Sequence, residues 1–195
     1  MKFSPLKFGI ISCTVMLLAA IVYVMFSGMQ GPSAIGLASY ARGEMSAFVS
    51  LDDAPTRPAH TFIDPDGNEH TLADYQGQVI LVNYWATWCA PCVVEMPALD
   101  DLQARYGDDD FQVVTISADR RIEDAIAFFD ETGLENLPVY HDNSFAGPAA
   151  VGARGLPISI IYSRQGVELG RMPRDAEWGS EDAHALIEAA IRMGQ

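Results

Sequence analysis

Basic residues are scarce in this chain. Only 12 lysines and arginines stand against 26 aspartates and glutamates among 195 residues, and the formal net charge is −14. Both lysines, Lys2 and Lys7, lie near the N-terminus, so the rest of the chain is more acidic still. Because affinity for nucleic acid comes largely from cationic side chains on phosphates, we expect no nucleic-acid partner.

Cysteine is scarce as well, with three residues in the chain: Cys13, Cys89 and Cys92. A structural zinc site takes four protein ligands, and the sequence has neither a second close cysteine pair nor an H-x₃₋₅-H arrangement among its four histidines. We therefore expect no metal and no cofactor. Cys89 and Cys92 are then left as a pair for redox chemistry.

Charge is absent from residues 8–26, an apolar run of about the length that a helix needs to cross a bilayer. Lys2 and Lys7 precede this run, whereas Arg42 is the first basic residue after it, so the N-terminus is expected in the cytoplasm. We predict a cytoplasmic segment at 1–7, a single-pass anchor at 8–26 in the inner membrane, and the remainder of the chain in the periplasm.

A cleaved signal peptide is the alternative for this run, since Ala19-Ala20 is small enough for a cleavage site. The apolar sequence continues beyond it to Met25, which favours an uncleaved anchor. Lipidation at Cys13 is disfavoured, because only residues 8–12 separate Cys13 from Lys7.

Residues 27–55 are predicted as a linker with a short helix near 44–49, and residues 56–195 as one α/β domain. In this domain, apolar runs of strand length alternate with segments of helical period, and Asp66-Gly67 predicts a hairpin turn. This order predicts a mixed sheet flanked by helices, with an added N-terminal β-hairpin, and fits the thioredoxin plan. Strands are predicted at 61–63, 69–72, 79–85, 111–117, 137–140, 158–162 and 167–171, and helices at 91–106, 122–132 and 180–193.

Cys89 and Cys92 lie where the predicted strand 79–85 gives way to the predicted helix 91–106. A cysteine at a helix N-terminus has a lowered pKa, because the exposed N–H groups and the helix dipole favour the thiolate. Pro91 suits the first helical turn, since its missing N–H would have no partner there. We assign attack on a substrate disulfide to Cys89 and resolution of the mixed disulfide to Cys92.

The stretch from Val82 to Cys92 reads VNYWATWCAPC and is followed by Glu95-Met96-Pro97. It resembles the TlpA/ResA-like, membrane-anchored thiol–disulfide reductases of the thioredoxin family, and TlpA most closely. The resemblance covers about residues 40–195. It implies a thioredoxin-like fold and a redox-active disulfide between the two cysteines.

By this resemblance, a loop places Pro157, in the cis form, beside the Cys89 sulfur, and the Leu156 backbone pairs with an extended substrate segment. Trp88 is expected to shape the docking surface. The segment 175–178 also looks TlpA-like. The predicted substrate-binding residues are therefore Trp88, Leu156 and Pro157.

Glu95 lies three residues beyond Cys92, so both fall on one side of the helix. A carboxyl group buried there would have a raised pKa and would take the proton of Cys92 during resolution, the role that the resemblance implies. Asn83 stands where cytoplasmic thioredoxins carry a buried aspartate, which leaves Glu95 as the acid for this work. Pro97 is expected to kink the helix, and Asn83, Pro91 and Pro97 to support the site.

The expected function is a periplasmic reductase that supports maturation of cytochrome c or of the copper site of cytochrome oxidase. Its expected partners are exported proteins with cysteine pairs and a membrane thiol transporter that donates electrons. A disulfide-forming oxidase remains an alternative, although Ala90-Pro91 adds no charge that stabilises a thiolate. A copper-binding assembly factor is a second alternative, with His141 as the candidate third ligand, but such proteins space their cysteines by three residues rather than two.

Overall fold

The computed structural model describes residues 36–193 of the chain. The predicted cytoplasmic segment 1–7, the anchor 8–26 and the first part of the linker, together with Cys13, lie outside the described residues. Within the described range, no helix combines the length and the apolar character needed to cross a bilayer.

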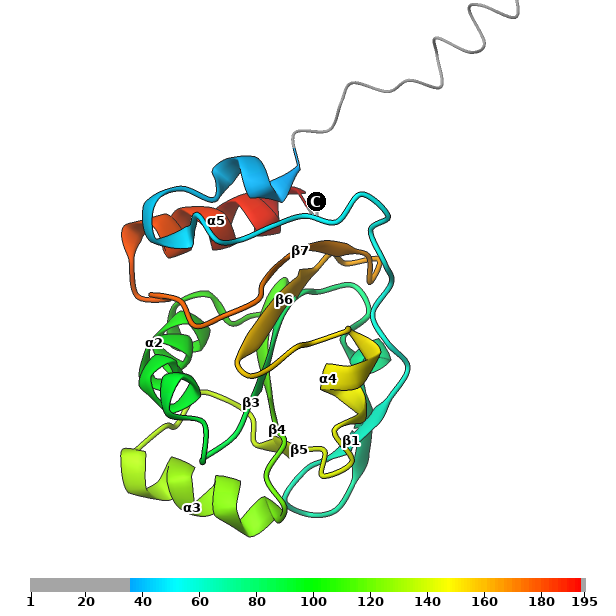
Figure 1. Ribbon diagram of the computed structural model, residues 1–195, viewed down its shortest axis with the longest axis vertical. Coiled ribbons are helices and arrows are strands. Elements are labelled where there is room, and N and C mark those ends of the chain that lie inside the picture. Colours follow the sequence, from blue (N-terminus) through cyan, green and yellow to red (C-terminus); the bar gives the residue numbers. More distant parts are fainter. Residues whose placement is uncertain (1–35, 194–195) are drawn as a thin grey trace, which may run out of the picture. The chain divides into compact units, whose positions relative to one another are not determined.

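The strands are β1 Thr61–Ile63, β2 Glu69–Thr71, β3 Val79–Trp85, β4 Phe111–Ser117, β5 Tyr140–His141, β6 Ile158–Tyr162 and β7 Glu168–Met172. They form one mixed sheet in the order β2-β1-β5-β4-β3-β6-β7 (Figure 1). Strand β4 is parallel to both β3 and β5, whereas β6 and β7 continue antiparallel on one side and β1 and β2 on the other. The predicted mixed sheet with an added N-terminal hairpin is confirmed.

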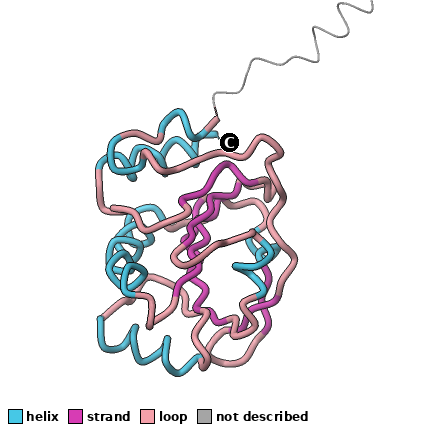
Figure 2. The backbone as a smooth tube through the Cα atoms, in the orientation of Figure 1, coloured by secondary structure: helices cyan, strands magenta, loops and turns pink. Residues whose placement is uncertain are grey.

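The helices are α2 Ala90–Tyr106, α3 Ile122–Thr132, α4 Ala146–Ala150 and α5 Glu181–Met193, with 3₁₀ turns η1 Leu37–Tyr40, η2 Gly43–Met45 and η3 Leu72–Tyr75. Helices α2 and α3 lie on one side of the sheet and α4 on the other (Figures 1 and 2). Helix α5 packs with η1 and η2. Helix α2 packs against the sheet at β4.

Strand β3 is buried along its whole length, as its almost continuous apolar run predicts. Its alternate side chains serve two apolar clusters. Leu81 and Trp85 join the cluster that contains α2, α3 and α5, whereas Ile80, Val82 and Tyr84 join the cluster on the opposite face. The sequence also predicts that Tyr84 packs under the active-site helix with Trp85. That prediction is wrong for Tyr84, because successive strand residues point to opposite faces.

Most predicted elements are confirmed, although several ends shift by a residue. The strand predicted at 137–140 is misplaced, since β5 begins only at Tyr140. Pro138 has no N–H to give to a sheet. The N–H of Leu137 is donated instead to Asp100 Oδ1 at 3.1 Å. The backbone hydrogen bonds of β5 therefore begin after Leu137 and Pro138.

The linker predicted at 27–55 overlaps the folded domain. Leu37, Met45 and Phe48 are 1%, 0% and 3% exposed and belong to the cluster around α2 and α5. Val49 exchanges two backbone hydrogen bonds with β7, at 2.9 and 2.8 Å. These few apolar residues are too irregularly spaced to show a period in the sequence. The short helix predicted near 44–49 is the 3₁₀ turn η2, which ends at Met45.

Phe48→Ala is expected to lower the free energy of unfolding by about 3 to 5 kcal/mol, because it leaves a cavity in the apolar cluster beside Gly170 of β7. The neighbouring Val49 is 44% exposed, so Val49→Ala is a matched control with a change within about 0.5 kcal/mol. Urea unfolding followed by circular dichroism measures both. Equal stability of the two variants would mean that this segment is not part of the core.

Candidate active site

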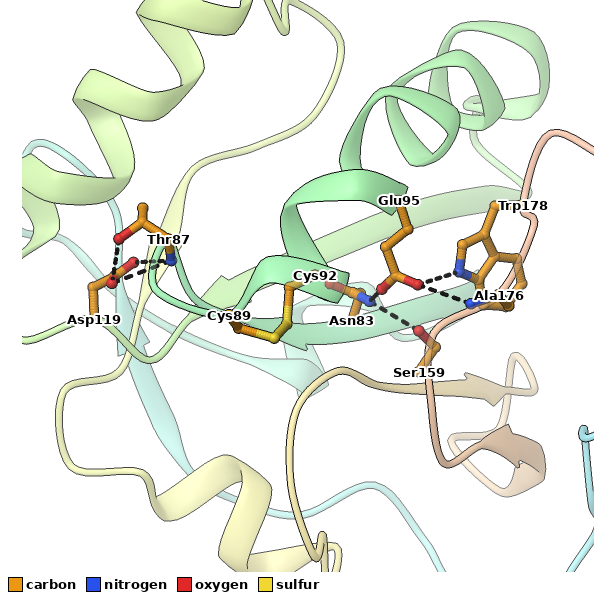
Figure 3. Close-up of a disulfide and its surroundings, with 9 residues drawn as sticks. All are labelled: Asn83, Thr87, Cys89, Cys92, Glu95, Asp119, Ser159, Ala176 and Trp178. Carbon is orange, nitrogen blue, oxygen red and sulfur yellow. Dashed lines mark hydrogen bonds between the residues drawn. A yellow bond between two sulfur atoms is a disulfide. The ribbon is translucent and has the colours of Figure 1, made fainter.

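The two cysteines form a disulfide at the start of α2 (Figure 3). Cys89 is the residue that precedes the helix, and Pro91 lies in the first turn as the sequence predicts. Cys89 is 6% exposed, whereas Cys92 is 0% exposed. A protein substrate therefore reaches the Cys89 sulfur first, and this asymmetry supports attack by Cys89 and resolution by Cys92.

Two large apolar side chains close to the cysteines in the sequence are exposed. Trp88 is 64% exposed and Val94, in the first turns of α2, is 77% exposed. Pro157 is buried and Leu156 is half-buried. The Leu156–Pro157 peptide bond is cis, which confirms what the resemblance implies. The roles of Trp88, Leu156 and Pro157 in binding a substrate stay predictions.

The Glu95 carboxylate is buried behind the disulfide, where it meets groups from two other segments, β3 and the loop that contains Ala176 and Trp178 (Figure 3). Asn83 Nδ2 in β3 donates to Oε1 at 2.6 Å. The backbone N–H of Ala176 and the indole N–H of Trp178 donate to Oε2 at 3.2 and 3.3 Å. Asn83 Nδ2 also donates to Ser159 Oγ in β6 at 2.9 Å.

Burial raises the pKa of Glu95 to about 7, against the opposing effect of its three donors, which favour the carboxylate. The expectation of a buried carboxyl group with a raised pKa is therefore confirmed. A group with such a pKa exchanges its proton readily near neutral pH, as a general acid or base must.

Sequence reasoning found Glu95 and Asn83 but missed Trp178, Ala176 and Ser159. The Trp178 indole comes from a residue 83 positions away from Glu95. The only signal was the likeness of residues 175–178 to TlpA, which marks the segment without naming its contact. A tertiary contact of this range leaves no periodic trace in the sequence.

Glu95→Gln is expected to remove a pH dependence of stability in the oxidised protein. The pKa rises from 4.5 to about 7 on folding, which corresponds to about 3 kcal/mol. Between these pH values the folded chain holds a proton that the unfolded chain has lost. The contribution of Glu95 to stability is therefore largest below pH 4.5, falls as the pH rises to about 7, and stays low above it.

Urea unfolding at several pH values measures this effect. At pH 8 the Gln variant is expected to be more stable than the native chain by about 3 kcal/mol, a difference that disappears at pH 4. Glu131→Gln, an exposed glutamate on α3, is the matched control. If the stability of both variants follows the native pH profile, ionisation of Glu95 does not destabilise the fold.

A second polar cluster is made of Thr87, Ser117 and Asp119 and joins the loop before Cys89 to the end of β4. Figure 3 shows Thr87 and Asp119. The Asp119 carboxylate accepts the Thr87 N–H at 3.1 Å and the Thr87 and Ser117 hydroxyls, each at 2.7 Å. Asp119 is 2% exposed, so these bonds are shielded from water. They tie the loop before Cys89 to Asp119. No pattern in the sequence predicts this cluster.

His141, the candidate third copper ligand, is buried, and its Nε2 lies 2.9 Å from the Asp119 carbonyl oxygen. Across residues 36–193, no group of three or more His, Cys, Asp or Glu side chains is arranged to hold a metal ion. Pro97 lies inside α2, which continues through it to Tyr106. The kink expected at Pro97 stays a prediction.

The protein-family model described as Redoxin matches residues 52–169, more than half of the chain. The chain belongs to the Redoxin family. The thiol-disulfide oxidoreductase ResA of Oceanobacillus iheyensis is 31% identical over 133 residues, covering 68% of this chain and 63% of that protein. The thioredoxin-like protein YneN of Bacillus subtilis is 30% identical over 153 residues, covering 77% of this chain and 85% of that protein.

Solved structures of related proteins have the same fold. The thioredoxin domain of a thiol-disulfide oxidoreductase from Bacteroides vulgatus has a TM-score of 0.62 at 26% identity, covering 73% of this chain and 99% of that one. This Redoxin-family chain shares the thioredoxin-like fold of that domain, and Cys89 and Cys92 form its disulfide. The match spans less than two thirds of the Oceanobacillus ResA. The Redoxin match ends at residue 169, before Trp178, so the indole contact to Glu95 lies beyond it.

Proposed function

We propose that this Redoxin-family chain reduces disulfides of exported proteins through Cys89 and Cys92. The observation that carries the proposal is the buried Glu95 carboxyl group, which lies behind the disulfide with a pKa of about 7. A carboxyl group held there supplies the proton acceptor that resolution by a buried thiol requires.

The reaction begins with the reduced chain. The Cys89 thiolate attacks one substrate sulfur, which breaks the substrate disulfide, forms a mixed disulfide and releases one substrate thiolate. Glu95 takes the proton of Cys92, and the Cys92 thiolate attacks the Cys89 sulfur. The mixed disulfide breaks, the internal disulfide forms and the second substrate thiolate leaves. Two electrons pass to the substrate, whose thiolates take up one proton from Glu95 and one from water.

The charge around the pair supports reduction rather than oxidation of partners. A strongly oxidising pair depends on stabilisation of the thiolate in its reduced form. The first turn of α2 carries no charged side chain, so the helix N-terminus is the stabilising element that α2 itself provides for the Cys89 thiolate. An ionised Glu95 on the same helix disfavours a second negative charge nearby.

The proposal places the domain in the periplasm, held by an inner-membrane anchor at residues 8–26, with a membrane thiol transporter as electron donor. The proposed substrates are the cysteine pairs of apocytochrome c or of copper-site proteins of respiratory oxidases. Support comes from the apolar run with its basic N-terminal flank, from the W-A-T-W-C-A-P-C motif, and from the similarity to ResA over 68% of the chain.

The reduction potential of the full chain tests the direction of the reaction. After equilibration with glutathione buffers, the ratio of oxidised to reduced chain is read from Trp88 fluorescence and from alkylation of the free thiols. A potential closer to that of thioredoxin, about −270 mV, than to that of DsbA, about −120 mV, is expected. A value near that of DsbA would mean that the chain is a disulfide-forming oxidase and not a reductase.

A further inference from the structure

Asn83 contains a buried acceptor with no partner. Its side chain is fully buried in β3, and both of its Nδ2 hydrogens are used, by Glu95 Oε1 at 2.6 Å and Ser159 Oγ at 2.9 Å. Among the described residues, nothing donates to its Oδ1. A buried carbonyl oxygen without a hydrogen bond is unfavourable, so its presence beside a redox centre calls for an explanation.

The position of this amide relates it to Cys92. Asn83 alternates with Leu81 and Trp85 along β3 and therefore faces α2. Figure 3 shows its side chain between the disulfide and Glu95. Because Nδ2 faces Glu95 and Ser159, Oδ1 is directed to the other side, where Cys92 lies.

Cys92 in the disulfide has no hydrogen to donate, but a reduced thiol has one. We propose that Asn83 is a redox-dependent positioning residue, whose Oδ1 accepts a hydrogen bond from the Cys92 thiol once the disulfide is reduced. The inference rests on the proposed function, since it concerns the thiol that resolves the mixed disulfide. This hydrogen bond gives Asn83 Oδ1 a partner in the reduced chain only.

This arrangement joins the two groups between which the resolving proton moves. The oxygen of one amide holds the Cys92 thiol, and the nitrogen of the same amide holds the Glu95 carboxylate. The amide thus favours the protonated thiol and the ionised carboxylate until the mixed disulfide forms. Its geometry also fixes the Cys92 sulfur on the side of the helix that faces the strand.

The reduced form gains from this bond and the oxidised form does not. Two glutathione thiols reduce the chain by breaking the Cys89–Cys92 bond, forming one glutathione disulfide and leaving both cysteines as thiols. The Asn83 acceptor is satisfied only after that step. Asn83 therefore makes the chain easier to reduce than it would be with an apolar side chain at this position.

Infrared spectroscopy of the reduced full chain tests the bond without altering Asn83. The S–H stretching band of Cys92, identified by its loss in Cys92→Ala, is expected at a lower frequency than that of a free thiol. A free-thiol frequency would overturn the proposal. In Asn83→Leu the band is expected to move to the free-thiol position, whereas in Ser159→Ala it stays where it is.

The glutathione equilibrium gives a second readout. At pH 8, where Glu95 is ionised, Asn83→Leu is expected to reduce the equilibrium constant for reduction of the chain about tenfold, or about 30 mV. Ser159→Ala removes a neighbour of the same amide and is expected to change that constant less than about twofold. A change of equal size in the two variants would show a general effect of packing and overturn the proposal.

The two proposals fail in distinguishable ways. If the native chain does not exchange electrons with glutathione at all, the reductase function fails. If the native chain exchanges normally and the Asn83→Leu constant equals the native one, the function stands and the Asn83 bond is absent.

Discussion

The Cys92→Ala chain is expected to attack a disulfide substrate and then stop. Cys89 keeps its place before α2 and is the more exposed of the two sulfurs, so the mixed disulfide still forms. Without Cys92 there is no thiolate to break it. Turnover of a protein disulfide is therefore expected to fall by about a thousandfold or more, while one equivalent of covalent adduct accumulates.

Non-reducing electrophoresis and mass spectrometry of the full chain follow the adduct, and a dithiol-driven assay follows turnover. Cys89→Ala is expected to give neither adduct nor turnover. Cys13→Ala is the matched control and is expected to behave as the native chain, since the redox centre is the other pair. An adduct on Cys92 in the Cys89→Ala chain would reverse the assignment of the two roles.

The strand and helix around the redox centre were predictable because their signals are local. An almost continuous apolar run predicts β3, and helical spacing after Pro91 predicts α2. Glu95 was predictable for the same reason, since residues three apart on a helix share a side. Such features depend on neighbours within a few residues, and a single sequence contains them in full.

What the sequence did not provide depends on contacts between distant segments. Helix α4 contains Gly147 and Pro148, two residues that disfavour helices, and is only five residues long. The bond from Trp178 to Glu95 and the one from Thr87 to Asp119 join residues 83 and 32 positions apart. Neither bond follows from local pattern, so the polar surroundings of the site emerge only from the fold.

Glu95→Gln is expected to slow resolution of the mixed disulfide by about a hundredfold at neutral pH, the lower range for loss of a general base. The amide fills the same volume but takes no proton from Cys92. Stopped-flow mixing of the reduced chain with a fluorescent disulfide substrate separates formation of the mixed disulfide from its resolution. The first step is expected to keep its native rate, because it uses the Cys89 thiolate.

The pH dependence identifies the group. Glu95 acts as a base only when ionised, so the native rate of resolution is expected to rise with pH and level off above about 7. The Gln variant depends on ionisation of Cys92 itself, so its rate continues to rise toward the pKa of a thiol, about 8.5. The two rates differ most near pH 7 and converge at high pH. If the rate of resolution has the same pH dependence in the native chain and in the Gln variant, Glu95 is not the base that takes the proton of Cys92.

One substitution thus has opposite consequences for stability and for rate. Near pH 8, Glu95→Gln is expected to stabilise the fold by about 3 kcal/mol while slowing the resolving step. A carboxylate that weakens its own protein is expected where a reaction needs it, because activity and stability compete at such sites. A variant that is stabilised yet resolves the mixed disulfide at the native rate would separate the two effects and leave the burial of Glu95 without a function.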